Sequence, residues 1–456
     1  MVSIDGLVSG LDTTSLVQQL MQLERAPQVR LANQQSQLKT TITGYQGLNT
    51  QFSLIGNAAE AAAEAATWTA ARATSSDDAR VGVTATPGAP AARLTVAVQQ
   101  LATDQVSTST ATVSSPTDAA VITTAITLTR GGSTTDLTLA GTSLADLVKA
   151  INGADAGVTA SAVQDTPGSY RLVLTSTGTD TVSVTATADG SDPFTTALGP
   201  LTQTSAGTDA ELLVGGPGGY LVTRSSNTVS DLLDGVTLTL KQADPSAAVT
   251  VEVGPDVDAI TAKVDKMVSA ANAALGEISR LTAYDAETGS AGVLMGDSLP
   301  RLLQQRIVDA VRGSGDGSAG AAGITVTRDG TLTFDKARFA EAYAADPAGV
   351  QAAIGAGTDS GPGLAARLDA VAGDATRSQS AEGGPGLITS ALDSRNRQVQ
   401  GLTDRIADYD RRLEMREQTL LRQFTAMETA LSAAQQQSSW LSSQLAGLST
   451  NWMGNP

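Results

Sequence analysis

The sequence contains no cysteine and no histidine, and aromatic residues make up only 3% of it. Without thiols and imidazoles the chain has no disulfides, no cysteine nucleophile, no Ser-His-Asp triad and almost none of the usual zinc ligands. We therefore expect no bound metal and no catalytic site that depends on cysteine or histidine. Composition alone excludes most classes of enzyme.

Long apolar runs are also absent, because no stretch reaches the 18 or more residues that a membrane-spanning helix needs. We expect no membrane span, and residues 1–10 lack the basic and apolar segments of a cleaved secretion signal. The 46 acidic residues exceed the 29 basic ones and leave a formal charge of −17. Because phosphate binding depends on clustered Lys and Arg, nucleic acid is not an expected partner.

The middle of the chain, 76–255, is rich in Thr, Gly and Ser and has alternating apolar and polar runs that predict half-buried strands. Two short helices are predicted at 143–151 and 228–233, because Ser or Thr precedes Asp by three residues at each start, as in a capping box. Their shared pattern also indicates a weak internal repeat of helix and hairpin. The predicted strands include 93–98, 126–129, 170–174 and 236–240.

The helical period precedes and follows this middle region, which predicts a multidomain α+β fold. Thr-rich β domains with short helices are inserted into a discontinuous helical domain, and long coiled-coil helices form the ends. The second segment of the helical domain carries a β-hairpin at 323–335 with Asp329 and Gly330 in its turn. The expected divisions are an N-terminal coiled-coil leg at 1–40, a first helical-domain segment at 41–75, a β-rich head at 76–255 (subdomains 76–110 with 203–255, and 111–202), a second helical-domain segment at 256–385 and a C-terminal coiled-coil leg at 386–456.

Both ends carry apolar residues at heptad spacing, which is typical of coiled coils. Pro27 predicts a short first helix, capped by Asp12, and a longer second helix that ends in the Ala-rich stretch 58–66. One helix over 387–445 would be roughly 90 Å long, too long for a globular core. The expected assembly seam consists of Leu16, Leu20, Leu23, Leu31, Leu38, Tyr45, Leu48, Phe52, Ile55, Leu392, Val399, Leu402, Ile406, Tyr409, Leu413, Leu420, Phe424, Met427, Leu431, Trp440 and Leu441.

The period alone leaves the partner of this seam open. Within one chain, the two ends would form a long antiparallel hairpin of helices. Their position at the termini, their Gln-rich flanks and the late Trp440 favour burial against another molecule instead.

Few motifs typical of catalytic or ligand-binding sites are present, and the elements or residues around each one do not fit such a site. The GxGxxG match at 315–320 follows a helix and precedes a strand, the reverse of a dinucleotide site. Ser36 and Lys39 fit Ser-x-x-Lys but lie on the outer face of the heptads. Asp256 and Asp258 begin like a calcium loop but lack its later oxygen ligand and its glycine. We interpret all of them as structural.

Short segments at both ends and in the interior occur in the same order as in one known family. They are 6–12 (GLVSGLD), 422–428 (RQFTAME), 437–441 (QSSWL), 227–240, 292–297 and 323–335. Together they resemble the flagellar hook-associated protein 2 family, the filament cap proteins of bacterial flagella, and 144–162 is similar to a small module inserted in flagellins. The signature residues in this sequence are Gly6, Leu7, Gly10, Leu11, Asp12, Pro27, Met427 and Glu428.

The resemblance implies a structural assembly factor that is not an enzyme and has no catalytic residue and no cofactor. It would cap the growing filament, promote flagellin polymerisation at the tip and prevent subunit leakage. The resemblance also implies secretion through the flagellar export channel to an extracellular position at the flagellum tip. The implied partners are flagellin, hook-filament junction proteins, the export apparatus, a cytoplasmic export chaperone and further copies of the chain. The copies would form a ring, expected to be a pentamer, with four to six copies open.

Two other functions remain open on the residues alone. Another flagellar axial protein, of the flagellin or hook-filament junction type, would also have paired terminal coiled coils. A surface adhesin with a β-rich glycan-binding head on a helical stalk would share the same layout. The segment 424–428 and the position of Trp440 favour the cap.

Overall fold

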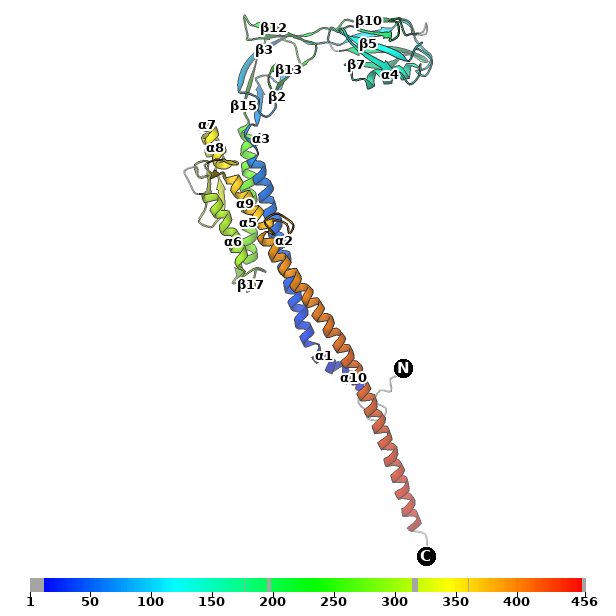
Figure 1. Cartoon of the computed structure of the whole chain (residues 1–456), viewed down its shortest axis with the longest axis vertical. Helices are drawn as coiled ribbons and strands as arrows, with labels where there is room; N and C mark the ends of the chain where they lie inside the picture. Colours follow the sequence, from blue (N-terminus) through cyan, green and yellow to red (C-terminus); the bar gives the residue numbers. More distant parts are fainter. Residues whose placement is uncertain (1–11, 177, 195–197, 314–318, 360, 453–456) are drawn as a thin grey trace. The chain divides into compact units, whose positions relative to one another are not determined.

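The computed structural model describes residues 12–176, 178–194, 198–313, 319–359 and 361–452. The chain forms two compact units (Figure 1): a helical unit, which joins Met1–Glu64 to Thr261–Pro456, and a β unit, Ala65–Ile260. The β unit is thus inserted into a discontinuous helical unit. The predicted α+β class with long terminal helices is confirmed.

In its described residues, the helical unit is built from helices and three small strand pairs. Its helices are α1 (Thr13–Glu24), α2 (Ala26–Ala63), α5 (Val257–Thr282, which begins in the β unit), α6 (Ser298–Arg312), α7 (Lys336–Ala345), α8 (Pro347–Ile354), α9 (Leu364–Thr376) and α10 (Leu387–Trp452). The strand pairs are β16 (Tyr284–Asp285) with β17 (Ser290–Ala291), β18 (Ile324–Val326) with β19 (Leu332–Phe334), and β20 (Gly357–Thr358) with β21 (Gly361–Pro362).

The break between α1 and α2 follows from Pro27. Proline has no backbone N–H and cannot continue the hydrogen-bond ladder of α1, but it is tolerated in the first turn of a new helix. The Asp12 carboxylate accepts from the Ser15 N–H at 2.8 Å and caps the start of α1. The predicted short helix, break and longer helix are confirmed. Since α2 runs through the expected limit at 40/41 without a break, the division into leg and helical domain stays a prediction.

The core of the helical unit lies along one face of α2. This helix packs against α9 and α10, and α6 packs against α9. A Cβ on Gly56 of α2 would lie 3.4 Å from the Cβ of Ala372 in α9, so the two helices approach closely. The α2 residues on this face are fully buried at helical spacing: Tyr45, Leu48, Phe52, Ile55 and Ala59.

Within the part of the β unit that the structure describes, there are two separate apolar cores. The first lies between the sheet β1-β15-β3-β11-β12 and the sheet β13-β14-β2. These strands, preceded by the short helix α3 (Ala65–Trp68), are β1 (Ala71–Ser75), β2 (Val81–Ala85), β3 (Ala92–Gln100), β11 (Ala210–Val214), β12 (Tyr220–Arg224), β13 (Thr228–Leu233), β14 (Val236–Leu240) and β15 (Val249–Pro255).

The second core lies between the sheet β10-β4-β8-β7, the sheet β6-β5-β9 and the helix α4. Because β4 and β10 belong to this group, the expected subdomain limits at 110/111 and 202/203 move to near the bridge between Thr103 and Thr208. The elements are β4 (Gln105–Ser109), β5 (Ala125–Arg130), β6 (Ser133–Thr138), α4 (Leu144–Gly153), β7 (Val158–Thr166), β8 (Ser169–Ser176), β9 (Val182–Ala186) and β10 (Leu201–Ser205).

Of the two short helices predicted in this unit, one is confirmed and one is wrong. Ser143 and Asp146 form the capping box of α4, each side chain accepting from the other's N–H at 3.2 Å. The segment 228–233 is instead the strand β13, and the internal repeat is wrong with it. Val229 is buried in the first core, and the Asp231 carboxylate accepts from Arg224 rather than capping a helix. Burial of a β-branched residue outweighed the local capping signal.

Candidate assembly surface on the terminal helices

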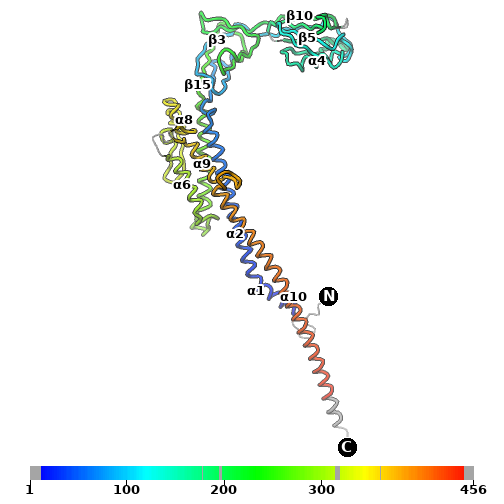
Figure 2. Tube along the Cα trace, viewed as in Figure 1, coloured from blue at the N-terminus to red at the C-terminus, as the bar shows by residue number. Residues whose placement is uncertain are grey.

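The helices α1 and α2 run antiparallel to α10 (Figure 2). Side-chain contacts fix their register. In each contacting pair the two residue numbers add up to 438 or 440, so residue n of α1 or α2 lies opposite a residue of α10 near 439 − n. The pairs are Tyr45 with Arg395, Gln35 with Thr403, Gln28 with Asp410 and Glu24 with Arg416.

A polar cluster fixes the proximal region of this helix pair, close to the rest of the helical unit. The Tyr45 hydroxyl donates to Asp297 Oδ2 at 2.5 Å, and Arg395 Nη2 donates to the same oxygen at 2.6 Å. The guanidinium carbon of Arg395 lies 4.6 Å from the centre of the Tyr45 ring. Burial and the hydrogen bond to Asp297 raise the pKa of Tyr45. Asp297 also caps α6 by accepting from the Leu299 N–H, so the cluster ties α2, α6 and α10 together.

Farther along the pair, α1 packs on α10 through a small apolar cluster. Val17 and Met21 are 2% and 3% exposed, and they lie against Leu413 and Leu420 of α10 with Phe424 at the edge. At the end of α1, Arg416 Nε donates to Glu24 Oε1 at 3.1 Å. Among the described residues this cluster draws only on α1 and α10, so it is small.

The predicted seam of α1 is not the face that packs within the chain. Leu16, Leu20 and Leu23 are 40%, 38% and 75% exposed. The packed residues lie one or two positions away, and the sequence prediction missed them because it followed the leucines. The signal was present in Val17 and Met21, which are themselves four residues apart and form a second apolar stripe.

The structure divides the predicted seam residues into three groups. The buried ones are Leu31, Tyr45, Leu48, Phe52, Ile55, Leu402, Leu413 and Leu420. The half-buried ones are Leu38, Leu392, Val399, Ile406, Tyr409 and Phe424. The exposed ones are Leu16, Leu20, Leu23, Met427, Leu431, Trp440 and Leu441.

The signature residues have different positions in the structure. Asp12 caps α1, Pro27 is half-buried at the start of α2, and Glu428 of α10 is 8% exposed beside the exposed Met427. The others, Gly6, Leu7, Gly10 and Leu11, lie outside the described residues.

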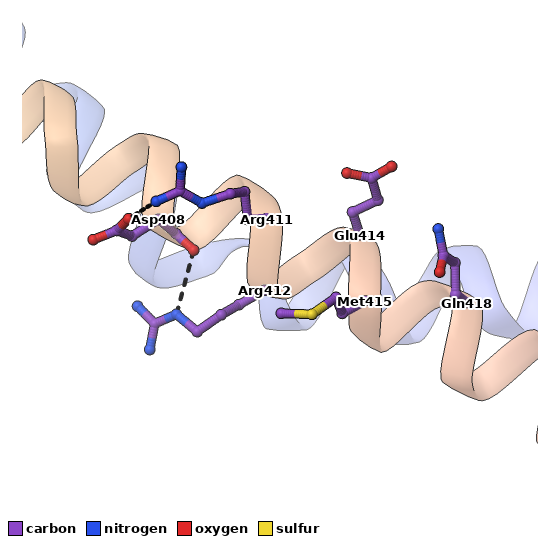
Figure 3. A pocket seen from close by; sticks show the side chains of 6 residues that line it. All are labelled: Asp408, Arg411, Arg412, Glu414, Met415 and Gln418. Carbon is purple, nitrogen blue, oxygen red and sulfur yellow. Dashed lines mark hydrogen bonds and ion pairs between the residues drawn. The ribbon is translucent and has the colours of Figure 1, made fainter.

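A shallow hollow on α10 holds a group of charged side chains but does not gather them into a site (Figure 3). Arg411 pairs with the Asp408 carboxylate one turn away, and Arg412 Nε donates to the Asp408 carbonyl oxygen at 3.4 Å. Figure 3 shows Glu414 and Met415 projecting in different directions from the helix. We interpret this face as solvated helix surface. Within the described residues there is no group of three or more potential metal ligands, and no helix is long and apolar enough to cross a membrane.

Comparison with known proteins identifies the family. Residues 9–105 match the family model described as flagellar hook-associated protein 2 N-terminus, and residues 207–436, about half of the chain, match the C-terminus model of the same protein. The chain belongs to the flagellar hook-associated protein 2 family. Between the two matches, residues 125–178 match the flagellin hook IN motif, which covers β5 to β8 and the helix α4.

Individual relatives extend this assignment. The lateral flagellar hook-associated protein 2 of Vibrio parahaemolyticus is 30% identical over 53% of this chain, and the chain spans about half (54%) of that relative's length. The flagellar hook-associated protein 2 of Escherichia coli K12 is 28% identical over 97% of this chain and 98% of its own length. The crystal structure of the D1-D2-D3 domains of the flagellar cap protein FliD from Escherichia coli superposes with a TM-score of 0.59 at 28% identity, covering 77% of this chain and 99% of that chain.

Proposed function

We propose that this protein caps the growing bacterial flagellar filament, where it promotes flagellin polymerisation and prevents subunits from leaking away. Its role is structural, with no catalysis and no cofactor. It is secreted through the flagellar export channel and acts outside the cell, at the flagellum tip. The family match at both ends and the likeness to a solved flagellar cap protein support this proposal.

The observation that carries the proposal is the exposed apolar surface of the terminal helices. In a monomer, a solvent-exposed row of leucines on one helix face does not contribute to folding stability. In an assembly factor, the same leucines are buried against partner molecules. Leu16, Leu20 and Leu23 of α1 and Trp440 and Leu441 of α10 form such surfaces. The helical unit therefore supplies docking surfaces.

The partners follow from the same role. They are further copies of the chain in a ring, expected to be a pentamer with four to six copies open, together with flagellin and the hook-filament junction proteins. Before assembly, the chain binds a cytoplasmic export chaperone and the flagellar export apparatus.

Deletion of the gene tests this function. We expect cells without it to lack long filaments and to release monomeric flagellin into the medium, and a plasmid copy to restore both filaments and swimming. Intact swimming with lost attachment to surfaces would favour a surface adhesin with a glycan-binding head. Filaments that are absent without any flagellin in the medium would favour another axial protein of the flagellin or junction type.

A further inference from the structure

Two surfaces of the helical unit combine exposed apolar residues with a complete lack of charge. Residues 13–23 of α1 and 429–452 of α10 contain no Asp, Glu, Lys or Arg. In α1 the exposed residues are Leu16, Leu20 and Leu23, and we call these the α1 stripe. A helix face that stays in water normally carries interspersed charges, so these neutral faces are suited to burial. The second surface, here the distal α10 surface, consists of Leu431, Leu441 and Leu445, which share one side of the helix and are 37% to 60% exposed.

The register of the helix pair prevents these two surfaces from meeting within one chain. Opposite residues have numbers that add up to about 439, so Leu20 lies across from α10 near residue 419. To reach Leu441 it would have to shift along α10 by 22 residues, about 33 Å at 1.5 Å per residue. That shift would break the contact of Glu24 with Arg416 and separate Val17 and Met21 from their apolar partners. Among the described residues, the α1 stripe and the distal α10 surface can therefore meet only between two molecules.

The spacing of the two surfaces is complementary. The α1 stripe has steps of four and three residues, and Leu441 and Leu445 repeat the step of four. Side chains at such steps lie on one helix face and can insert between those of a facing helix. Every copy of the chain carries one α1 stripe and one distal α10 surface. Two different surfaces on each copy make a head-to-tail contact, which closes into a ring when the rotation permits it.

We propose that the α1 stripe of one copy packs on the distal α10 surface of a second copy. This contact rests on the proposed homo-oligomeric function and assigns its residues. In an assembly, each copy would retain its own Val17 and Met21 contact and use the adjacent leucine face of α1 for its neighbour. The in-chain and between-chain contacts thus use different faces of one helix.

Engineered disulfides test the contact directly, because the full chain contains no cysteine. Leu20→Cys and Leu441→Cys proteins are prepared separately, mixed at equal concentration, oxidised and run on a non-reducing gel. A disulfide needs Cα atoms about 4.4–6.8 Å apart, so only neighbouring positions react. Leu431→Cys and Leu445→Cys replace Leu441→Cys in parallel mixtures, so that several registers between the copies are sampled. Gln19→Cys with Ser439→Cys provides a control pair on exposed polar positions of the same helices.

We expect at least one mixture of Leu20→Cys with a distal variant to form a cross-linked dimer at least about tenfold faster than the control pair, because assembly raises the local concentration of the thiols. The variant carrying Leu20→Cys and the reactive distal cysteine together should give a ladder that ends at the ring number. Dimers formed by Leu20→Cys alone or by a distal variant alone would overturn the head-to-tail contact, since they require like surfaces to meet.

Native mass measurement of the same samples separates this contact from the proposed function. Rings without any cross-link in the mixtures would refute the contact and leave capping by a ring intact. Monomers at every concentration, again without cross-links, would refute both the contact and the ring. Cross-linking in vitro with no filament defect on gene deletion would leave the contact standing and refute the capping function.

Discussion

The proximal and distal regions of the terminal helices have the same spacing of apolar residues. The chain buries these residues in the proximal region and leaves many of them exposed in the distal region. In the proximal region, Tyr45 and Phe52 are fully buried, and the Tyr45 hydroxyl donates to Asp297, which also accepts from Arg395. In the distal region, Leu16 of α1 is 40% exposed, and Leu441, on α10 beyond the residues that lie opposite the described part of α1, is 55% exposed. The heptad period shows where a helix has an apolar face, and the neighbouring elements decide whether the chain itself covers it.

The difference comes from the number of helices that meet. Proximally, α2 contacts both α9 and α10, so a wide face of α2 is enclosed. Distally, α1 contacts α10 through a narrow strip, and the second apolar stripe of α1 faces outward. The buried side chains should therefore determine folding stability, and the exposed distal ones should determine association. Four changes test this division.

The largest effect is expected from Phe52→Ala in the proximal region. The side chain is fully buried, and its loss leaves a cavity in the helical core. We expect the free energy of unfolding to fall by about 3–5 kcal/mol, measured by urea denaturation followed by far-ultraviolet circular dichroism. The matched distal change, Leu441→Ala, should alter it by less than about 0.5 kcal/mol. Equal losses from the two variants would contradict the division.

Leu420→Asp should have the next largest effect, because it places a carboxylate in the cluster around Val17 and Met21. The expected cost is on the order of 2–3 kcal/mol, less than for a deeper site since α1 can detach and let water in. Hydrogen exchange of α1 should become fast while that of the β unit stays unchanged. In cells, we expect monomeric flagellin in the medium. Arg422→Asp, an exposed change two residues away, should be much milder, and equal damage would indicate general misfolding.

Tyr45→Phe should have a smaller effect that depends on pH. At neutral pH, loss of the hydrogen bond to Asp297 should cost about 1 kcal/mol, because Arg395 still pairs with that carboxylate. The folded pKa of Tyr45 is raised above the usual value of about 10. Its stabilising contribution is therefore complete below that value and is lost as the pH rises toward the folded pKa. Above pH 10, the free energy of unfolding of the parent protein should decline with rising pH, and that of Tyr45→Phe should not show this decline. Parallel declines would exclude Tyr45 as the cause.

The smallest effect is expected in the β unit, which lies outside the helix pair. Hydrogen bonds from Arg171 lower the pKa of Asp165 to about 2. The carboxylate contributes to stability above its usual pKa, and this contribution is lost as the pH falls from about 4 toward 2. Asp165→Asn should slightly weaken the hairpin of β7 and β8 at neutral pH and remove some of the acid dependence. A change in association on this substitution would contradict the separation of the two units.

Local patterns predicted much of the fold. Pro27 and Asp12 give the break and the start of the first helices because their effects act within one helical turn. The capping motif gave the wrong prediction at 228–233. Val229 is buried there in a sheet core formed by strands distant in the sequence, which no local pattern can predict. The bond between Arg395 and Asp297 joins residues 98 positions apart, so no local period predicts it. The face of α1 that packs within the chain was missed because two apolar stripes compete on one helix.

Hydrogen exchange measured against protein concentration tests the central claim most directly. The full chain is labelled at a series of dilutions, and peptides from the proximal and distal regions of α10 are compared by mass spectrometry. We expect the proximal segment 387–413 to be protected equally at every concentration, since its cover comes from the same chain. Residues 429–445 should exchange rapidly when dilute and slowly when concentrated. Protection of both segments that is independent of concentration would contradict the assignment of the distal surface to association between copies.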